Sequence, residues 1–380
     1  MKKILIVNNN LSSGGIQKAL VNLLRAIADQ YEVTLLLFSP SGPMMAEIPP
    51  QVQVLSPGAI YKTLGLTRTE LSSRPFLYVA KGILKVFARL SNKRLAMRIC
   101  GLLQKPFGRY DAAISYTHMT HHKSFDTGCA EFVLDKVQAD QKICFIHCDY
   151  GASGFASQEN NAAYHAFDRI VCVSESVRSR FLSIVPDLEE KTMAIRNFYD
   201  LRIRDKARAF PVDYASDRIN LVLVARLSAE KGIDRAIEAL KKAERTDIML
   251  HIVGDGPQRE ALQTLCRERD LMDRVRFYGE QSNPYPYMAA ADYLLMSSLH
   301  EAAPMVFDEA HVLGLPILSV ELLSTKEMLK DTDMECPNST EGLTEALVHL
   351  QKCGKKVSPE DSNRQIAARF AELIDGKRLC

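Results

Sequence analysis

Short apolar runs alternate along the whole chain with stretches in which apolar residues recur every three or four positions. The runs predict strands, and the stretches between them predict amphipathic helices. Regular alternation of this kind is typical of βαβ units, in which a parallel sheet is buried on both faces. In the first half of the chain, strands are predicted at 3–8, 32–38, 111–116, 142–146 and 169–173. In the second half they are predicted at 219–224, 248–253, 275–278, 292–296 and 316–320.

The first helix is predicted to begin near Ile16, because the apolar residues that follow fall on one helical face. Further helices are predicted at about 231–244, 257–270, 284–290 and 304–313. Two α/β series in 380 residues predict two Rossmann-like domains, residues 1–197 and 198–362. A last helix, at about 363–375 within the C-terminal segment 363–380, has one apolar face. Either domain could cover that face, and packing on the first domain is one of the two arrangements.

The composition excludes several classes of protein. The chain has 48 Lys and Arg against 46 Asp and Glu, a net charge of +2, which argues against a surface built to bind nucleic acid. Nine cysteines without a repeating spacing are typical of reduced thiols in the cytoplasm. The apolar run after Lys3 is too short for a signal peptide, and Lys or Arg interrupts the most apolar stretch, 76–103. We therefore expect a cytoplasmic protein that does not cross a membrane.

The loop between the first strand and the first helix is a candidate binding site. Its sequence is Ser12-Ser13-Gly14-Gly15. Gly14 and Gly15 allow a phosphate or sugar to approach the backbone, and the dipole of the following helix favours an anion. The loop lacks the GxGxxG pattern of dinucleotide-binding proteins. The alternative is a plain turn that uses glycine for a positive φ.

Two further loops follow strands in the second half. Arg226 and Lys231 come directly after the strand at 219–224, at the start of a helix. An arginine fork and a lysine point charge that converge there suit a diphosphate, whereas the alternative is a solvated pair at a helix start. Gly254 opens the turn Gly254-Asp255-Gly256-Pro257 after the next strand. The carboxyl end of a strand is where open α/β sheets bind ligands.

The stretch from Glu301 to Glu309 is the most informative part of the chain. Glu301 is predicted in a loop after a strand, and Glu309 about one turn into the next helix. Glu301 could accept hydrogen bonds from sugar hydroxyls, and Glu309 could bind the diol of a ribose. The backbone N–H groups around Pro304, Met305 and Val306 open the helix and could hold a phosphate.

Taken in order, these motifs resemble retaining glycosyltransferases of family four, which have the GT-B fold. That fold consists of two Rossmann-like domains whose parallel sheets face a central cleft. The resemblance covers nearly the whole chain. It rests on the Gly14-Gly15 loop, Ile146-His147-Cys148-Asp149, Val173-Ser174-Glu175-Ser176, Arg226 with Lys231, Gly254-Asp255-Gly256-Pro257, Phe277-Tyr278-Gly279, Ala291-Asp292, and Glu301 to Glu309.

The resemblance implies a role for each of these residues toward a nucleotide-sugar donor. Arg226 and Lys231 would bind the diphosphate, and Glu309 the ribose. Glu301 would contact the donor-sugar hydroxyls beside the bond that breaks, and His147 the sugar and acceptor side. The donor-binding set is Gly14, Gly15, Arg226, Lys231, Gly254, Pro304, Met305, Val306 and Glu309, and the catalytic pair is Glu301 and His147. Because two cations can stabilise the leaving diphosphate, no metal and no cofactor are expected.

Two departures from the family pattern affect the expected sugar pocket. The usual glycine after the first glutamate is Ala302, which is neutral unless that position needs a positive φ. The glycine-containing ending common after Glu327 is replaced by Asp331-Thr332-Asp333-Met334-Glu335-Cys336, which is expected to trim a loop near the donor. These changes leave the identity of the sugar open.

Three patterns are interpreted as not functional. Asp331-Thr332-Asp333 matches a metal-binding DxD motif but falls in the late loop. His118, His121 and His122 place two imidazoles four positions apart, which suits zinc only on a helix, and no carboxylate or cysteine completes the set. A cluster in the acceptor cleft, or a plain loop, is favoured there. Cys144 and Cys148 are expected to pack as small apolar residues.

Residues 61–110 carry a large local excess of positive charge. They contain eleven Lys and Arg and only one acidic residue, a net +10, so the remainder carries −8. Within this segment, Lys81, Lys85 and Arg89 form a cationic stripe. An apolar stripe is formed by Phe76, Val79, Ala80, Ile83 and Phe87. A basic amphipathic helix of this type binds anionic lipid, and the alternative is a helix packed on the core with a solvated charged face.

The expected activity is transfer of a hexose or N-acetylhexosamine, with retention, from a nucleoside-diphosphate sugar, UDP being the favoured nucleotide. The acceptor would be a hydroxyl of a polyprenyl-diphosphate-linked or surface-polysaccharide glycan at the inner face of the cell membrane. Two alternatives stay open. One is a glycosyltransferase-like subunit without catalysis, and the other is a GT-B epimerase acting on the nucleotide-sugar. The missing GxGxxG disfavours a dehydrogenase.

Overall fold

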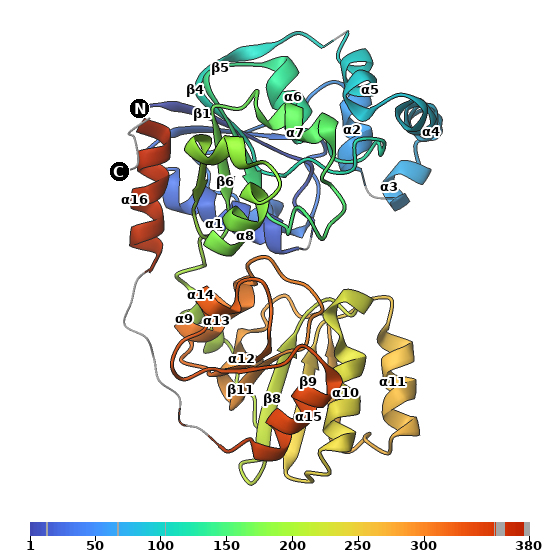
Figure 1. Cartoon of the computed structure of the whole chain (residues 1–380), viewed down its shortest axis with the longest axis vertical. Helices are drawn as coiled ribbons and strands as arrows, with labels where there is room; N and C mark the ends of the chain where they lie inside the picture. The colour runs from blue at the N-terminus through green and yellow to red at the C-terminus, as the bar shows by residue number, and fades with distance from the viewer. Residues whose placement is uncertain (13, 67, 103, 353, 355–361, 376–380) are drawn as a thin grey trace. The chain divides into compact units, whose positions relative to one another are not determined.

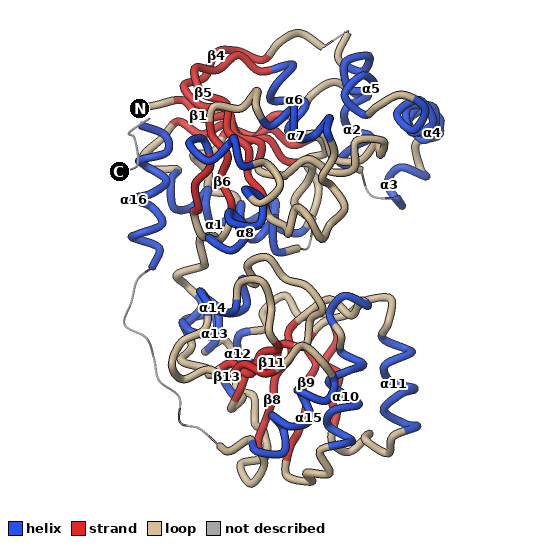
Figure 2. The backbone as a smooth tube through the Cα atoms, in the orientation of Figure 1, coloured by secondary structure: helices blue, strands red, loops and turns tan. Residues whose placement is uncertain are grey.

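The computed structural model describes residues 1–12, 14–66, 68–102, 104–352, 354 and 362–375. The chain divides into two compact units. The first consists of Met1–Phe198 together with Asp361–Cys380, and the second of Tyr199–Glu360 (Figure 1). Each unit contains one parallel sheet with helices packed around it, so the fold is α/β with two Rossmann-like domains (Figure 2).

The first unit has a seven-stranded parallel sheet in the order β3-β2-β1-β4-β5-β6-β7. Its strands are β1 (Lys3–Asn8), β2 (Glu32–Leu37), β3 (Gln53–Leu55), β4 (Phe107–Ser115), β5 (Val137–Ile146), β6 (Arg169–Cys172) and β7 (Thr192–Ala194). Its helices are α1 (Gly15–Ile27), α2 (Ala59–Gly65), α3 (Arg68–Ser72), α4 (Pro75–Leu90), α5 (Lys93–Cys100), α6 (Cys129–Lys136), α7 (Gln158–Tyr164), α8 (Glu175–Leu182) and α16 (Ser362–Asp375). The strand order reverses between β1 and β4.

The second unit has a six-stranded parallel sheet in the order β10-β9-β8-β11-β12-β13. Its strands are β8 (Ile219–Val224), β9 (Ile248–Val253), β10 (Val275–Gly279), β11 (Tyr293–Met296), β12 (Ile317–Val320) and β13 (Met334–Cys336). Its helices are α9 (Ile203–Ala207), α10 (Ile233–Lys242), α11 (Arg259–Glu268), α12 (Tyr285–Ala290), α13 (Met305–Val312), α14 (Thr325–Met328) and α15 (Thr340–His349). Here the order reverses between β8 and β11.

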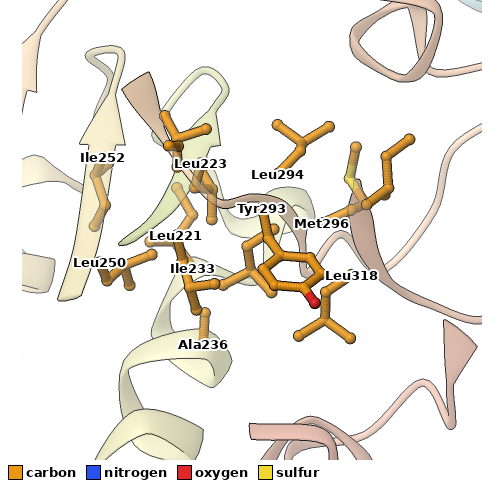
Figure 3. Packing of buried hydrophobic residues seen from close by; sticks show 14 of the residues in the cluster. Leu221, Leu223, Ile233, Ala236, Leu250, Ile252, Tyr293, Leu294, Met296 and Leu318 are labelled. Atoms are coloured by element: carbon orange, nitrogen blue, oxygen red, sulfur yellow. The ribbon is translucent and has the colours of Figure 1, made fainter. Parts of the chain in front are cut away.

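The core of the second unit explains why the apolar runs form its central strands. Side chains of β8 and β9 pack with those of β11 and β12, and α10 covers them with the apolar face that begins at Ile233 (Figure 3). Burial of these strands on both faces accounts for runs that are apolar at every position. The predicted strands of both series are confirmed, with ends shifted by a few residues.

Two sequence predictions about the fold need correction. The pattern missed β3, β7 and β13, which have three residues each and are too short for a periodicity to show. Asp331–Cys336 is predicted to belong to a loop, yet Met334–Cys336 forms β13 and pairs with β12. That edge strand extends the sheet of the second unit.

Candidate functional site

The loops that follow β8 and β11 meet at the point where the strand order of the second sheet reverses. The connections that follow these two adjacent strands run in opposite directions, which leaves a crevice outside the carboxyl ends of the strands. Doubly wound folds bind their ligands in such a crevice. Arg226 and Lys231 lie on the loop after β8, and Glu301 lies on the loop after β11. The fold therefore brings together residues that are far apart in the sequence.

Lys231 and Glu301 form the centre of this site. Lys231 Nζ lies 2.5 Å from Glu301 Oε1, and the Ser298 hydroxyl donates to the same carboxylate oxygen at 3.0 Å. The Ser297 hydroxyl donates to the Lys231 carbonyl at 3.0 Å, so the two loops are also joined through the backbone. Both charged side chains are partly exposed. They form a fixed, oriented pair of opposite charges that a polar ligand can reach.

Arg226 lies on the same loop as Lys231, two residues after the end of β8, and its side chain is exposed. The neighbouring Glu230 accepts a hydrogen bond from the Ser228 hydroxyl at 2.5 Å. That hydrogen bond, with the charges of Lys231 and Arg226, holds the pKa of the Glu230 carboxyl below its usual value. The guanidinium of Arg226 is therefore accessible at the edge of the sheet, and an accessible guanidinium can bind an anion.

The Gly254 turn lies against the same loop. Gly254 has φ +146°, and a Cβ there would overlap the carbonyl oxygen of Ala225. The Leu227 N–H donates to the Asp255 carbonyl at 2.9 Å, and the Gln258 N–H donates to the Leu227 carbonyl at 3.0 Å. Glycine is therefore needed at 254 so that the two loops can pack closely.

The segment from Pro304 to Glu309 forms the start of α13. Pro304 caps the helix, and Met305 and Val306 are its first residues, so their N–H groups precede the helical hydrogen-bond ladder. The Glu309 side chain is buried, with 3% of the residue exposed. Ala302 does not have a positive φ. Alanine in place of the family's glycine therefore causes no backbone strain.

In the first unit, Gly14 and Gly15 begin α1 directly after β1. Gly14 has φ 168°, an extended conformation that any residue can adopt, and neither glycine lies in the left-handed region that favours glycine. The alternative of a turn that needs glycine for its backbone conformation is therefore wrong. A Cβ on Gly15 would meet no atom within 4 Å, so the space beside it is open.

His147 follows β5 at the same edge of the first sheet. Its ring lies 4.9 Å from the ring of Tyr116, and its N–H backbone group donates to His118 Nδ1 at 3.4 Å. Burial and the nearby His118 lower the pKa of His147 to about 3, so the ring is neutral at physiological pH. Its Nε2 atom is buried and has no hydrogen-bond partner in the described chain. A buried polar atom of this kind is rare and is a natural contact for a ligand.

The patterns interpreted as not functional have structural explanations. Asp333 accepts hydrogen bonds from the Ile317 and Lys330 N–H groups at 2.9 and 2.8 Å, and pairs with His311 at 2.7 Å. The Asp333 carboxylate therefore anchors the turn before β13. His118, His121 and His122 lie outside helices, and no three metal-ligating side chains gather in the part of the chain that the structure describes. Cys144 is buried as expected, and Cys148 is partly buried.

Sequence reasoning missed Arg235 and Asn338, whose hydrogen bonds hold the loop after β11 in place. Arg235 donates to the Ser297 carbonyl at 2.5 Å and to Asn338 Oδ1 at 2.9 Å. Asn338 in turn donates to the Glu321 carbonyl at 2.9 Å. Arg235 lies in the first turn of α10, whereas Lys231 ends the short turn before it. The presence of another cation four residues after Lys231 was the available signal.

Helix α4 of the first unit differs from its predicted arrangement. Its exposed apolar stripe consists of Phe76, Val79, Ile83, Val86 and Leu90, which are 59% to 83% exposed. Lys81 does not belong to an outer cationic stripe, because its Nζ donates to the Thr63 carbonyl at 2.5 Å. Burial lowers the pKa of Lys81. The exposed stripe is therefore not packed on the core, although Leu77 and Ala88 of the same helix are buried. The part of the chain that the structure describes has no helix long and apolar enough to span a membrane.

Residues 207–373, which include Arg226, Lys231, Glu301 and Glu309, match the family model described as "Glycosyl transferases group 1". This stretch belongs to that family. The glycosyltransferase domain so defined contains the crevice between β8 and β11 and extends to the C-terminal helix α16. The resemblance inferred from the ordered motifs is confirmed.

Relatives of this glycosyltransferase domain include two proteins of Rhizobium meliloti named lipopolysaccharide core biosynthesis glycosyltransferases. LpsD is 32% identical over 163 residues, 42% of this chain and 46% of LpsD. LpsE is 30% identical over 216 residues, 55% of this chain and 60% of LpsE. The matched part of the chain thus spans about half the length of these relatives. Anabaena HepE, solved in complex with UDP, shares the fold with a TM-score of 0.67 at 17% identity, over 99% of this chain and 100% of HepE.

Proposed function

We propose that the protein is a glycosyltransferase that moves a hexose or N-acetylhexosamine from a UDP-sugar to a hydroxyl of a lipopolysaccharide or other surface-glycan precursor. The observation that carries the proposal is the meeting of Lys231 and Glu301 at the reversal of strand order, beside Arg226. The names of LpsD and LpsE and the UDP bound to HepE support the substrate class.

In this proposal each side chain has a separate task. Transfer breaks the bond between the anomeric carbon and a diphosphate oxygen and forms a bond to the acceptor oxygen. Negative charge develops on the departing diphosphate, where Arg226, Lys231 and the N–H groups of Met305 and Val306 stabilise it without a metal. Glu301 orients the sugar hydroxyls, and Glu309 binds the ribose. Gly14 and Gly15 leave room for the donor, and Gly254 holds the diphosphate loop.

His147 is proposed to contact the transferred sugar through its buried Nε2 atom. A neutral imidazole can either donate or accept a hydrogen bond at this atom, depending on its tautomer. Retention of the anomeric configuration is part of the proposal and rests on the resemblance to family four. The stereochemistry of the product, measured by NMR, tests it.

The variants Arg226→Ala and Glu309→Gln would test the donor site. Each is expected to lower turnover of a UDP-sugar by about 10²- to 10³-fold, as expected when a group that stabilises the reacting charge or positions the donor is lost. Circular dichroism checks folding, and Glu309→Gln is preferred to alanine because the site is buried. Arg267→Ala, on an exposed face of α11, is the matched control. Near wild-type rates for either site variant would overturn the assignment.

We also propose that α4 docks the protein on the anionic inner face of the cell membrane, where a polyprenyl-diphosphate-linked acceptor would be available. The exposed apolar stripe enters the lipid boundary, and the exposed Lys85 and Arg89 lie on its flank. The net charge of +10 over residues 61–110 complements an anionic surface. The protein then works in the cytoplasm as a peripheral membrane enzyme.

A further inference from the structure

The first unit contains a pocket that the proposed donor site does not use. Its volume is about 240 Å³, and it lies between the start of α5, α6, α7 and the loop after β4. This is below the roughly 300 to 1,000 Å³ of pockets for drug-sized ligands, so it has room for one small ring. Its position near the carboxyl end of β4 places it at the edge of the sheet where such folds bind ligands.

A buried ion pair forms one wall of the pocket. Lys93 Nζ lies 2.8 Å from Glu131 Oε1, and the two side chains are only 2% and 5% exposed. Lys93 also donates to the Thr120 hydroxyl at 3.0 Å, and its N–H donates to the His122 carbonyl at 2.6 Å. Asn160 of α7 donates to the Thr120 carbonyl at 2.9 Å. The wall is therefore preorganised by hydrogen bonds from three separate segments.

Two buried polar atoms on residues that line this pocket lack partners in the described chain. Glu131 Oε2 is an unused acceptor, and Arg94 Nε is an unused donor. Leaving such atoms unpaired costs about 1 to 3 kcal/mol each, and more for charged groups. Satisfying Glu131 Oε2 takes a ligand group that donates a hydrogen bond, and satisfying Arg94 Nε takes one that accepts. Hydroxyl groups have this double capacity.

The charged side chains that line the pocket balance one another. The two cations are Lys93 and Arg94, and the two carboxylates are Glu131 and Glu159. This balance offers no excess positive charge to a phosphate. The remaining wall is apolar and consists of Met119, Leu134, Ala162 and Ala163. Such a wall can pack against the carbon-bound hydrogens on one face of a sugar ring, so the chemistry favours a neutral, hydroxyl-rich ring.

The pocket also lies close to His147 in the first unit. Met119, one of its lining residues, directly follows His118, whose Nδ1 accepts the His147 N–H at 3.4 Å. Met119 itself is held by its N–H, which donates to the Tyr164 hydroxyl at 3.2 Å. A ring in the pocket would therefore contact the residue next to His118, which is the hydrogen-bond partner of the proposed sugar contact His147.

We propose that this pocket binds one neutral monosaccharide unit of the acceptor glycan, with Glu131 accepting from its hydroxyls. The identification of the ligand as an acceptor rests on the proposed glycosyltransferase function. The existence of a sugar-binding pocket in the first unit does not depend on it.

The test is saturation-transfer NMR on the full chain with a panel of methyl glycosides of glucose, galactose, mannose and N-acetylglucosamine. Wild type is expected to show a signal with at least one of them. Ala162→Trp, at an exposed position on the rim, fills the pocket and is expected to reduce that signal more than fivefold. Glu131→Gln keeps the shape but weakens the acceptor, and is expected to reduce it as well. Ala166→Trp, exposed just beyond α7, is the matched control and should bind as wild type does.

The outcomes separate this proposal from the proposed function. Binding of UDP, followed on the same samples by a thermal shift, reports the donor site alone. If UDP binds but no glycoside signal appears, or if Ala162→Trp leaves the signal intact, the pocket holds only water and the proposal fails. A signal that survives Ala162→Trp but is lost in Glu309→Gln comes from the donor site and also overturns it. If UDP does not bind while the glycoside signal responds as expected, the donor function fails and the pocket stands.

Discussion

Two glycine positions at strand ends differ in what the backbone requires of them. Gly254 has a positive φ and packs against the Ala225 carbonyl, so the fold itself needs glycine there. Gly15 is the first residue of a helix and faces open space. No described atom of the first unit lies where a side chain at position 15 would begin, and the proposed role of this glycine is to let the donor approach.

Substitution by alanine separates these two roles. Gly254→Ala is expected to lower the free energy of unfolding by about 1 to 3 kcal/mol or more, because it adds backbone strain and an overlap. Gly15→Ala is expected to keep or slightly raise stability, by up to about 1 kcal/mol, while weakening UDP-sugar binding. Urea unfolding and a UDP titration measure the two effects. A Gly15→Ala protein with normal binding would contradict the proposed role of this loop.

Buried histidines make the stability of the first unit depend on pH. Burial lowers the pKa of His147 to about 3 and that of His118 to about 4. Below about pH 6.5 the unfolded chain binds protons at these rings and the folded chain does not. Stability is therefore fully present above pH 6.5 and falls as the pH decreases.

We expect the free energy of unfolding to fall between pH 6.5 and 5 by about 1.4 kcal/mol per pH unit for each such histidine. Urea unfolding across this range measures the slope. His147→Phe removes one of the rings and should make the dependence shallower. His349→Gln, at an exposed position, should leave the slope unchanged. An unaltered slope in His147→Phe would show that this ring titrates normally.

At the scale of elements, α4 shows how one helix can serve both packing and binding. Leu77 and Ala88 are buried on its inner face, where Lys81 also reaches back to Thr63. The outer stripe repeats at intervals of three and four residues, so it stays on one side of the helix. The periodicity correctly indicated an amphipathic helix but did not reveal which side faced the protein.

Binding to anionic vesicles tests the outer face of α4. Ile83→Asp and the double variant Lys85→Glu with Arg89→Glu are each expected to weaken binding to phosphatidylserine vesicles more than tenfold, since each basic residue near the surface contributes about 1 kcal/mol. Lys241→Glu, exposed on α10, is the charge control. Unchanged vesicle binding would refute the docking proposal. A wild-type dimer that dissociates in Ile83→Asp would instead show that a second copy covers the stripe.

At the scale of the whole molecule, the chain returns to its first unit after completing the second. Helix α16 contacts the first unit at three places. Phe370 packs edge-on to Tyr31 at 6.3 Å, Arg369 donates to the Ala194 carbonyl at 2.8 Å, and Lys2 pairs with Asp375 at 3.2 Å. The last helix is therefore part of the first core, although it follows the second unit in sequence.

Phe370→Ala is expected to destabilise the first unit by about 3 to 5 kcal/mol, as is typical for removal of a buried aromatic ring. Hydrogen exchange measures where the loss falls. Protection should decrease in the first unit, including α1 and β1, and remain unchanged in α10 and β8 of the second. Phe210→Ala, at an exposed position of the second unit, is the matched control. Equal losses in both units would contradict the assignment of α16 to the first core.

The amino-acid sequence by itself determined the α/β class, the parallel strands and the chemically important loops. An apolar run long enough to form a strand buried on both faces shows in the local sequence where that strand lies. A three-residue strand such as β13 is too short to leave such a run. The tertiary structure alone decided the contacts. Lys231 and Glu301 are 70 positions apart, and only the reversal of strand order between β8 and β11 brings their loops together. Likewise, the pocket beside Glu131 and the outward direction of the α4 stripe depend on which elements pack together, and no local pattern records that.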